Sequence, residues 1–329
     1  MSEEKFITMS NEEYHSREEL GSSDVRRLMI SPLHYGGREE PAVRPPHFVF
    51  GSAAHCGYLE PNVFEDRYAP KPLEIDGKGP RTNYYKEWMA TQSLEVEWMN
   101  AEDFDKVLRV VESALDHPVT AEFFKGEVVT EGSLFFKLNG VDCKARPDLV
   151  NLDGGKVDVL DLKTTGTGAD PASFRKTVAN NQLHVQEWFY RKALKAAGFS
   201  VGRFVFLVCE KNPPFATAAY VLNQEDVASA EKKVADALLA YRTAVETEVW
   251  AGYPQEVTEI SLPKWAVERK EGANGNWITV KDAMKMMNIS RSSVYNWMGR
   301  GVESRTFGGK RLVSMRSMVS MMDSWKGVG

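Results

Sequence analysis

Two aspartates and a lysine stand where two apolar, strand-like segments end. The segment CKARPDLV contains Asp148, and VDVLDLKTT contains Asp161 and Lys163. Divalent ions such as Mg²⁺ take hard oxygen ligands, commonly one or two carboxylates plus water and substrate phosphate. A lysine beside such an ion can orient or help deprotonate an attacking water, or stabilise charge on a scissile phosphate. The three residues therefore predict metal-assisted phosphodiester hydrolysis, although an isolated Asp-x-Lys is also common on solvated strand faces.

The elements around these residues should bring their side chains together. Asn139-Gly140 is the strongest short signal for a two-residue hairpin, and it joins the strand-like segment EVVTEGSLFFKL to VDCKARPDLV. In the third, which begins at Val157, side chains alternate between the two faces of the strand. Asp161 and Lys163 therefore share one face near its end.

Helices should complete the site. We expect a long helix over about residues 171–197, two further strands, and a second helix over about residues 224–250. Gln186 and Tyr190 are four residues apart on the first helix, so both could point at the strand ends. Antiparallel strands followed by a helix that crosses to another strand predict an α/β or α+β sheet with helices packed on it.

Composition indicates an ordinary globular protein. The chain has 329 residues, of which 43% are hydrophobic and 26% charged, which suits one large domain plus a small one. No apolar run approaches the roughly 18 residues that span a bilayer, and no signal peptide is apparent, so we expect a cytoplasmic protein without a membrane partner. Cys56, Cys143 and Cys209 lie too far apart for a disulfide framework or a four-cysteine metal site, and we expect them to be buried.

Several ordered motifs resemble the PD-(D/E)xK nuclease superfamily, and more narrowly its RecB-like branch. These are FGSAAH, RPD, DLK and a Gln-x-x-x-Tyr motif. The longer blocks SPLHY, FGSAAHCGYLEP, GPRTNYYKEW and HVQEWFY are similar to the phage RecE-like exonucleases, also called exonuclease VIII, over about residues 7–250. The resemblance implies a restriction-endonuclease-like mixed sheet flanked by helices. It also implies a phage or prophage origin and Mg²⁺ as cofactor, with Mn²⁺ as a substitute.

The same resemblance assigns roles to individual residues. It implies Lys163 as the catalytic lysine, with Gln186 and Tyr190 positioning the substrate or that lysine. Glu60 is a weaker candidate near His55. The implied metal ligands are His55, Asp148, Asp161 and the carbonyl of Leu162.

Three neighbouring residues allow two interpretations each. His184 could contact DNA or pack between helices. Lys144 and Arg146 could bind a phosphate or pair with Asp142 on the surface.

The C-terminal segment differs from the rest of the chain in charge. The net charge of the chain is −5, yet from Trp277 onward Lys and Arg outnumber Asp and Glu nine to three, so residues 1–276 carry −11. An acidic body with a basic tail suggests a nucleic-acid-binding appendage, although a basic tail can also be a solubilising face. We therefore expect a nuclease domain over residues 1–250, a linker over 251–276 and a DNA-binding domain over 277–329.

The tail has the pattern of a helix-turn-helix. Thr279 and Ser290 should cap two short helices on either side of a turn at Asn288, and SRTFGGKRLVS should form a wing that turns at Gly308-Gly309. This resembles the winged-helix modules of excisionases and MerR-type regulators; the alternative is a helical protein-interaction domain. In such modules the second helix enters the major groove. The implied DNA contacts are Arg291, Ser292, Ser293, Asn296 and Arg300 on that helix, with Lys310 and Arg311 on the wing.

The resemblance to the RecE-like exonucleases implies one function. It is a Mg²⁺-dependent exodeoxyribonuclease that acts at double-stranded DNA ends, degrades one strand from its 5′ end and leaves a 3′ single strand for recombination. It further implies a homo-oligomeric ring of three or four subunits and a RecT-like single-strand annealing protein as partner. One alternative is a DNA-binding recruiter or regulator whose nuclease domain is degenerate. Another is a single-strand nuclease of the CRISPR-adaptation type, which the cysteine count disfavours because those enzymes usually hold an iron–sulfur cluster.

Overall fold

The computed structural model describes residues 5–38, 46–77, 79, 81–93, 95–262, 277–307 and 309–326. The chain divides into two compact units, Met1–Tyr253 and Pro254–Gly329. A five-stranded sheet of order β3-β6-β7-β8-β9 lies at the centre of the first unit. Its strands are β3 (Val128–Thr130), β6 (Leu149–Asn151), β7 (Val157–Thr165), β8 (Val201–Glu210) and β9 (Thr217–Tyr220). Only β7 and β8 run parallel among these neighbours, so the sheet is mixed, as predicted.

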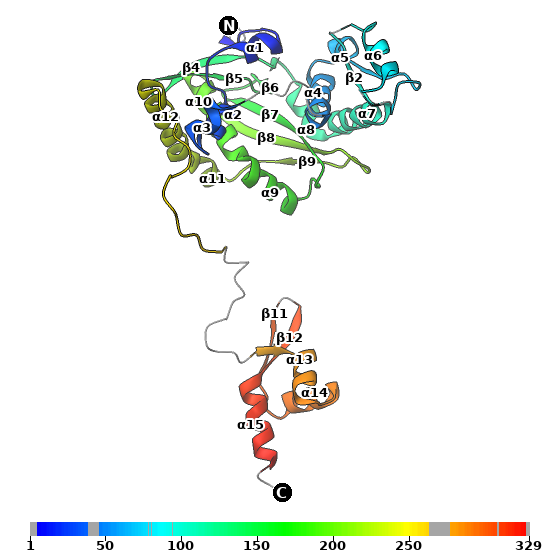
Figure 1. The fold of residues 1–329 in the computed structure, drawn as a ribbon, viewed down its shortest axis with the longest axis vertical. Coiled ribbons are helices and arrows are strands. Elements are labelled where there is room, and N and C mark those ends of the chain that lie inside the picture. The colour runs from blue at the N-terminus through cyan, green and yellow to red at the C-terminus, as the bar shows by residue number, and fades with distance from the viewer. Residues whose placement is uncertain are drawn as a thin grey trace. The chain divides into compact units, whose positions relative to one another are not determined.

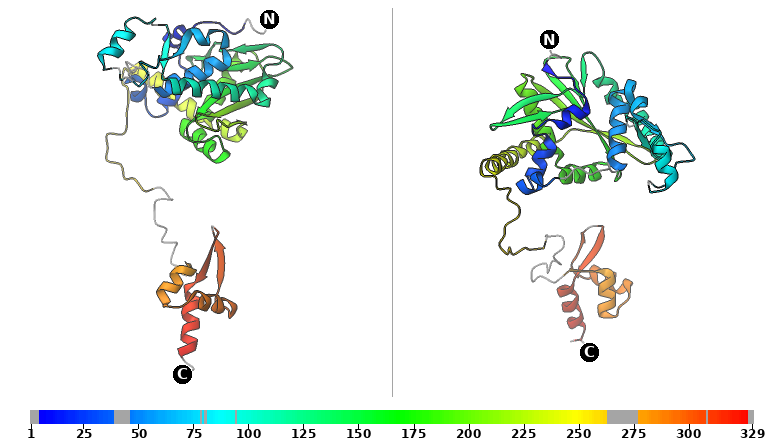
Figure 2. Two further views of the ribbon diagram at one scale, coloured as in Figure 1. Left: turned by 90° about the vertical axis from the view of Figure 1, so that its right-hand side faces the viewer. Right: turned by 45° about the horizontal axis from the view of Figure 1, so that its top comes forward.

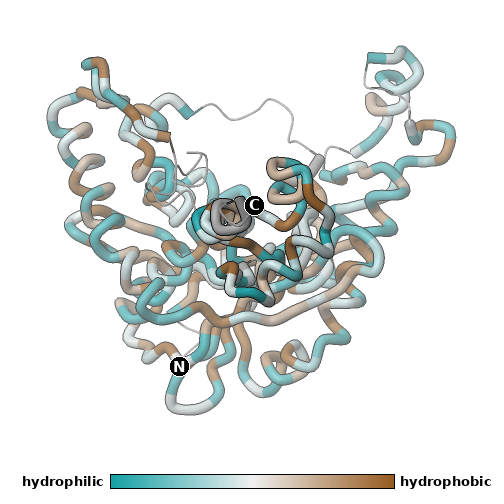
Figure 3. Tube along the Cα trace, turned by 90° about the horizontal axis from the view of Figure 1, so that it is seen from below, coloured by the Kyte–Doolittle hydropathy of each residue, from teal (hydrophilic) through white to brown (hydrophobic). Residues whose placement is uncertain are grey.

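Helices cover both faces of this sheet (Figures 1 and 2). On one face Val157 and Val159 of β7 pack with α2 (Ser22–Leu28), α10 (Leu183–Ala196) and α12 (Ala230–Thr247). On the other, Leu160 and Leu162 pack with α4 (Pro46–Leu59), α7 (Ala101–Asp116) and α8 (Pro118–Phe123). Neighbouring residues of β7 thus enter opposite cores, which is the period-two alternation of a strand buried on both sides. Figure 3 shows apolar and polar residues in turn along the covering helices.

The remaining elements of the first unit are short. They are α1 (Asn11–Ser16), α3 (Pro32–Gly36), α5 (Pro61–Arg67), β1 (Tyr68–Pro70), α6 (Asn83–Met89), β2 (Glu97–Met99), β4 (Leu134–Leu138), β5 (Val141–Ala145), α9 (Pro171–Asn181) and α11 (Gln224–Ala228). Strands β4 and β5 form the predicted hairpin, since Asn139 and Gly140 have φ of 50° and 81°. Positive φ at both positions is what a two-residue turn of this kind requires. In the part of the chain that the structure describes, no helix is long and apolar enough to cross a membrane.

Both long helices predicted from the sequence are interrupted. The first ends at Asn181, Gln182 takes a left-handed conformation with φ of 52°, and α10 begins at once at Leu183. The second divides at Ser229 into α11 and α12. Neither break has a glycine or proline to mark it. Near the N-terminus, Gly21 is the N-cap of α2, and α4 begins at Pro46.

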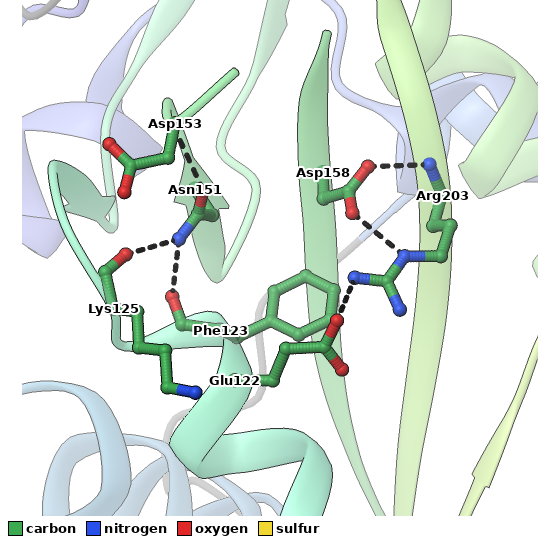
Figure 4. Close-up of polar contacts among 7 residues, drawn as sticks. All are labelled: Glu122, Phe123, Lys125, Asn151, Asp153, Asp158 and Arg203. Atoms are coloured by element: carbon green, nitrogen blue, oxygen red, sulfur yellow. Dashed lines mark hydrogen bonds and ion pairs between the residues drawn. The ribbon is translucent and has the colours of Figure 1, made fainter.

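A polar network fixes the end of the sheet opposite the predicted site (Figure 4). Arg203 on β8 donates from its backbone N–H and its Nε to the two carboxylate oxygens of Asp158 on β7, at 2.7 and 2.8 Å, and from Nη2 to Glu122 on α8 at 2.7 Å. Asn151, at the end of β6, donates from Nδ2 to the carbonyls of Phe123 and Lys125. The three central strands and α8 are thereby held in register, which also sets where the opposite strand ends lie.

The second unit has a three-stranded sheet of order β10-β12-β11. Thr279 and Ser290 cap its first two helices through their side-chain oxygens, and Asn288 between them has φ of 50°, as predicted. Gly308 of the predicted wing turn lies outside the described residues. Strand β10, which pairs with β12, was not predicted. The elements are β10 (Trp277–Thr279), α13 (Val280–Met287), α14 (Arg291–Gly299), β11 (Ser304–Phe307), β12 (Lys310–Ser314) and α15 (Met315–Lys326).

Candidate active site

The two predicted carboxylates lie on neighbouring strands. Asp148 immediately precedes β6, and Leu149 and Leu160 are partners in the antiparallel β6–β7 register, so Asp148 and Asp161 lie opposite each other one position beyond this pair. Asp148 Oδ2 accepts a hydrogen bond of 2.7 Å from the backbone N–H of Leu162. Asp161 is fully buried. Leu162, whose carbonyl the resemblance implies as a metal ligand, thus contacts Asp148 through its amide.

His55 reaches this site from α4. Its Nδ1 lies 2.9 Å from the carbonyl oxygen of Gly51, and its Nε2 lies 3.1 Å from Asp148 Oδ2. Because both ring nitrogens face oxygen acceptors, the ring donates from both and is an imidazolium in this arrangement. Burial lowers the pKa of His55, but the charge and hydrogen bond of Asp148 outweigh it and raise the pKa to about 9. Burial likewise opposes ionisation of Asp148, yet His55 holds the pKa of that carboxyl below its ordinary value.

Lys163 and Gln186 both contact Asp161. The Lys163 ammonium forms an ion pair with Oδ1, and Gln186 on α10 donates from Nε2 to Oδ2 at 2.8 Å. Gln186 therefore orients a carboxylate in this structure rather than the lysine. Burial raises the pKa of Asp161 to about 6, with attraction from Lys163 lowering it and repulsion from Asp148 adding to the rise.

Tyr190 lies one helical turn beyond Gln186 on α10 and is buried. Burial raises the pKa of its phenol well above the ordinary value of 10, and the charges of Asp161 and Asp148 add to the rise. Tyr190 thus lies within electrostatic range of both carboxylates. It lines a cavity that it shares with Glu131 and Arg146.

The donor atoms of this site suit a divalent cation. In the described ranges no group of three or more His, Cys, Asp or Glu side chains is already arranged around one ion position. Instead each acid lies against a cation, with His55 on Asp148 and Lys163 on Asp161. Asp161 Oδ1 is buried, and the Lys163 ammonium is its ion-pair partner. Two carboxylates and one imidazole are ligands that Mg²⁺ or Mn²⁺ accepts, and such an ion would take over the charge compensation that the two cations now provide.

Glu131 is a further acidic residue at the site that no motif marks. It follows β3 with φ of 52°, and its backbone N–H donates to the carbonyl of Asp148 at 3.0 Å. Burial, with repulsion from Asp148, raises the pKa of Glu131 to about 8 against the opposing charges of His55 and Arg146. Glu60, the weaker candidate from the sequence, is instead paired with Arg67 at 2.9 Å.

Lys144 and Arg146 are buried and hold the N-terminal segment. Lys144 Nζ donates to the carbonyls of Tyr14 and Arg17 at 2.7 and 2.6 Å. Arg146 donates to Ser133 Oγ and to two backbone carbonyls of the N-terminal segment. Of the two interpretations, the surface pairing with Asp142 is wrong, because Asp142 pairs with Lys137. The segment before α2 covers Lys144 and Arg146 instead.

The remaining candidate residues are His184 in the first unit and the predicted DNA contacts in the second. His184 lines a cavity of about 630 Å³ together with Phe174 and Tyr220, and none of the residues around that cavity belongs to the site. In the second unit Ser293 is partly buried, and its Oγ and N–H both bond to Ser290 Oγ. The remaining candidate DNA contacts are all exposed: Arg291, Ser292, Asn296, Arg300, Lys310 and Arg311.

Comparisons with known proteins bear on the fold and the family. None of the curated proteins matches the sequence. A solved structure from Eubacterium rectale shares the fold at a TM-score of 0.53 and 12% identity. The alignment covers 80% of this chain and 99% of that protein, which is described as an inferred exonuclease. A phage-related exonuclease from Haemophilus somnus 129PT aligns at 9% identity over 73% of this chain and 100% of its own, but its TM-score of 0.33 does not establish a common fold.

A family model settles the classification. Residues 31–261, which hold every residue of the strand-end site, match a family described as a PDDEXK-like domain of unknown function (DUF3799). Pro147-Asp148 and Asp161-Leu162-Lys163 have the residue types that this name abbreviates, which are Pro-Asp followed by Asp or Glu, any residue and Lys. Such domains generally use divalent metals, which supports a nuclease. The chain therefore belongs to the PDDEXK-like DUF3799 family.

Proposed function

We propose that this protein is a Mg²⁺-dependent exodeoxyribonuclease. The observation that carries the proposal is the meeting of Asp148, Asp161 and Lys163 on adjacent strands, with Gln186 holding Asp161. A structural ion pair would not require two acids, an imidazolium and a lysine together in a largely buried place. Burying several charged groups costs free energy, and sites that do so are commonly functional.

Each side chain has a role in this proposal. His55, Asp148, Asp161 and the carbonyl of Leu162 would hold the ion, which when bound polarises phosphate oxygens and lowers the pKa of water. Lys163, close to Asp161, stabilises the negative charge that develops on the scissile phosphate. Gln186 keeps the Asp161 carboxylate in place, and the bond from His55 Nδ1–H to the Gly51 carbonyl fixes the ring so that Nε2 faces the site.

The finer features of the activity rest on the resemblance to RecE-like exonucleases. They are attack on linear double-stranded DNA from 5′ ends, production of 3′ single strands for recombination, a ring of three or four subunits, and a single-strand annealing partner. A closed ring would also favour processive digestion, because cyclic symmetry can enclose the substrate. The mass of the protein in solution tests the ring directly.

The second unit is proposed to bind duplex DNA. Its exposed cations on α14 and on the β11–β12 hairpin suit phosphate contacts, and short polar side chains such as Asn296 suit base edges. Replacing Arg291 and Arg300 by Ala should weaken binding of the full chain to duplex DNA and lower its dependence on salt. Unchanged binding would favour a protein-interaction unit.

End-labelled DNA tests the proposal. Linear duplex labelled at either the 5′ or the 3′ end, and a closed circle, are incubated with the protein in Mg²⁺ or EDTA. We expect Mg²⁺-dependent early release of the 5′ label and no attack on the circle. Asp161→Ala should abolish release, whereas Asp236→Ala, which removes an exposed acid on α12, should not. Binding of DNA without degradation would instead support a recruiter or regulator with a degenerate nuclease domain.

A further inference from the structure

A groove leaves the strand-end site on the side of Lys163. It encloses about 530 Å³ and extends from Lys163 and Gln186 to Arg26 and Arg27 on α2. Its far wall is the junction of α9 and α10, where Gln182 has its left-handed conformation. Helix α2 packs against α10 in the core beneath (Figure 1). We call this feature the Arg26 groove.

The charge of the Arg26 groove is positive. Lys163, Arg26 and Arg27 line it, the other described lining residues are neutral, and none of them carries a carboxylate. Arg27 reaches Asp24, which lies outside the lining, at 3.4 Å across an exposed surface. By contrast, the two cavities on the His55 and Tyr190 side contain Glu131. A polyanion is therefore favoured on the Lys163 side of the site.

Arg26 and Gln182 differ in their hydrogen bonds. Arg26 donates from Nη1 to the carbonyl of Asn181 at 2.7 Å, which ties α2 to the helix junction and uses one of the five N–H groups of its guanidinium. Burial lowers the pKa of Arg26, and attraction from Asp161 opposes this, so the guanidinium lies within electrostatic reach of the site. Gln182 Oε1 is buried and accepts no hydrogen bond from the residues that the structure describes.

The number of cations is informative about the ligand. Arg26, Arg27 and Lys163 line one groove, and a single phosphate would leave part of this positive charge without a counterion. Successive phosphates of one strand could neutralise all three. The groove therefore suits a nucleic acid strand better than an isolated phosphate.

We propose that the Arg26 groove binds the sugar-phosphate backbone of the strand that is being cut, next to the phosphate at Lys163. Arg26 and Arg27 contact successive backbone phosphates. This inference rests on the proposed function, because it takes the strand-end site as the place of cleavage. Binding of a strand can nevertheless be measured without cleavage, so the two can fail separately.

The test is binding of a fluorescent single-stranded 12-mer to the full chain in EDTA. Arg26→Gln and Arg27→Gln are compared with Arg109→Gln, which removes an exposed arginine of α7 that pairs with an acid three residues away, as Arg27 does. We expect the first two variants to bind roughly three- to tenfold more weakly. The slope of log K against log salt should become shallower by about 0.7 for each phosphate that an arginine no longer neutralises. Arg109→Gln should bind as the wild type does.

Competition distinguishes the two sources of phosphate. Inorganic phosphate at millimolar concentration should leave the 12-mer bound at constant ionic strength, whereas an unlabelled 12-mer should displace it. The inference is overturned if both groove variants bind the 12-mer as tightly as Arg109→Gln does. It is also overturned if inorganic phosphate displaces the 12-mer from the wild type at constant ionic strength. If the variants lose binding but the wild type cleaves no DNA in Mg²⁺, the groove stands and the proposed exonuclease fails.

Discussion

Gln186→Ala should weaken metal binding without unfolding the protein. In the wild type, the Gln186 amide donates to Asp161 Oδ2 at 2.8 Å, and only 7% of Gln186 and none of Asp161 is exposed. A hydrogen bond to a charged group contributes about 1.5–3 kcal/mol. Its loss raises the free energy of the ionised carboxylate by this amount, which corresponds to about 10–100-fold in affinity for an ion that binds that carboxylate. Ligand-orienting partners of metal sites typically have effects of this size.

The assay is a titration of Mn²⁺ at pH 7.5, followed by calorimetry and by the rate of DNA cleavage. We expect the midpoint to rise about 10–100-fold in Gln186→Ala, with much of the maximal rate recovered at high metal. Gln224→Ala is the matched control, because the Gln224 amide reaches the neighbouring buried carboxylate of Glu187 and not Asp161. An unchanged midpoint in Gln186→Ala, or an equal rise in Gln224→Ala, would refute the reasoning.

Three further predictions address protonation and packing. His55 must lose a proton before Nε2 can bind a metal, and its pKa is about 9, so Mn²⁺ affinity should rise between pH 7 and 9 by at most about tenfold per unit, and His55→Ala should flatten this profile. Burial raises the pKa of Asp161 from 3.8 to about 6, so its ionisation lowers the stability of the fold as pH rises from 3.8 to 6. Asp161→Asn should therefore melt at a higher temperature than the wild type at pH 7.5 in EDTA, but not at pH 4. If the variant and the wild type melt at the same temperature at both pH values, the buried charge does not destabilise the fold. Lys144→Met should increase hydrogen exchange of residues 5–20, because two backbone carbonyls lose their donor, whereas Lys137→Met, which removes an exposed ion pair on the adjacent strand, should leave exchange unchanged.

The sequence predicted the central strands and their face assignments because those signals are local. Alternation in β7 placed Val157, Val159, Asp161 and Lys163 on one side, and the structure has the two valines in the core that α10 also enters. The Asn-Gly turn likewise needs only its own two residues. Motif order then indicated that His55 would join Asp148, which the structure places 3.1 Å away.

Features that depend on tertiary contacts escaped prediction. The helix break at Gln182 lies in a segment without glycine or proline. Arg26 on α2, which is distant in the sequence, binds the carbonyl of Asn181 next to this break. Glu131 enters the site from a turn with no motif of its own. For Lys144 the sequence allowed a phosphate contact or a surface ion pair, since nothing in β5 reveals that the N-terminal segment will cover it. In each case the deciding partner is far away in the sequence.

The most direct test of the central claim is the rate of hydrolysis by a Lys163 variant. Release of acid-soluble nucleotides from linear duplex DNA in Mg²⁺ is measured for the wild type, Lys163→Met and Lys232→Met, the last of which removes an exposed lysine of α12. We predict that Lys163→Met loses about 10²–10³-fold or more in rate while still binding DNA, and that Lys232→Met keeps the wild-type rate. Wild-type activity in Lys163→Met, or the absence of Mg²⁺-dependent release from the wild type, would contradict the assignment of this strand-end site as a nuclease centre.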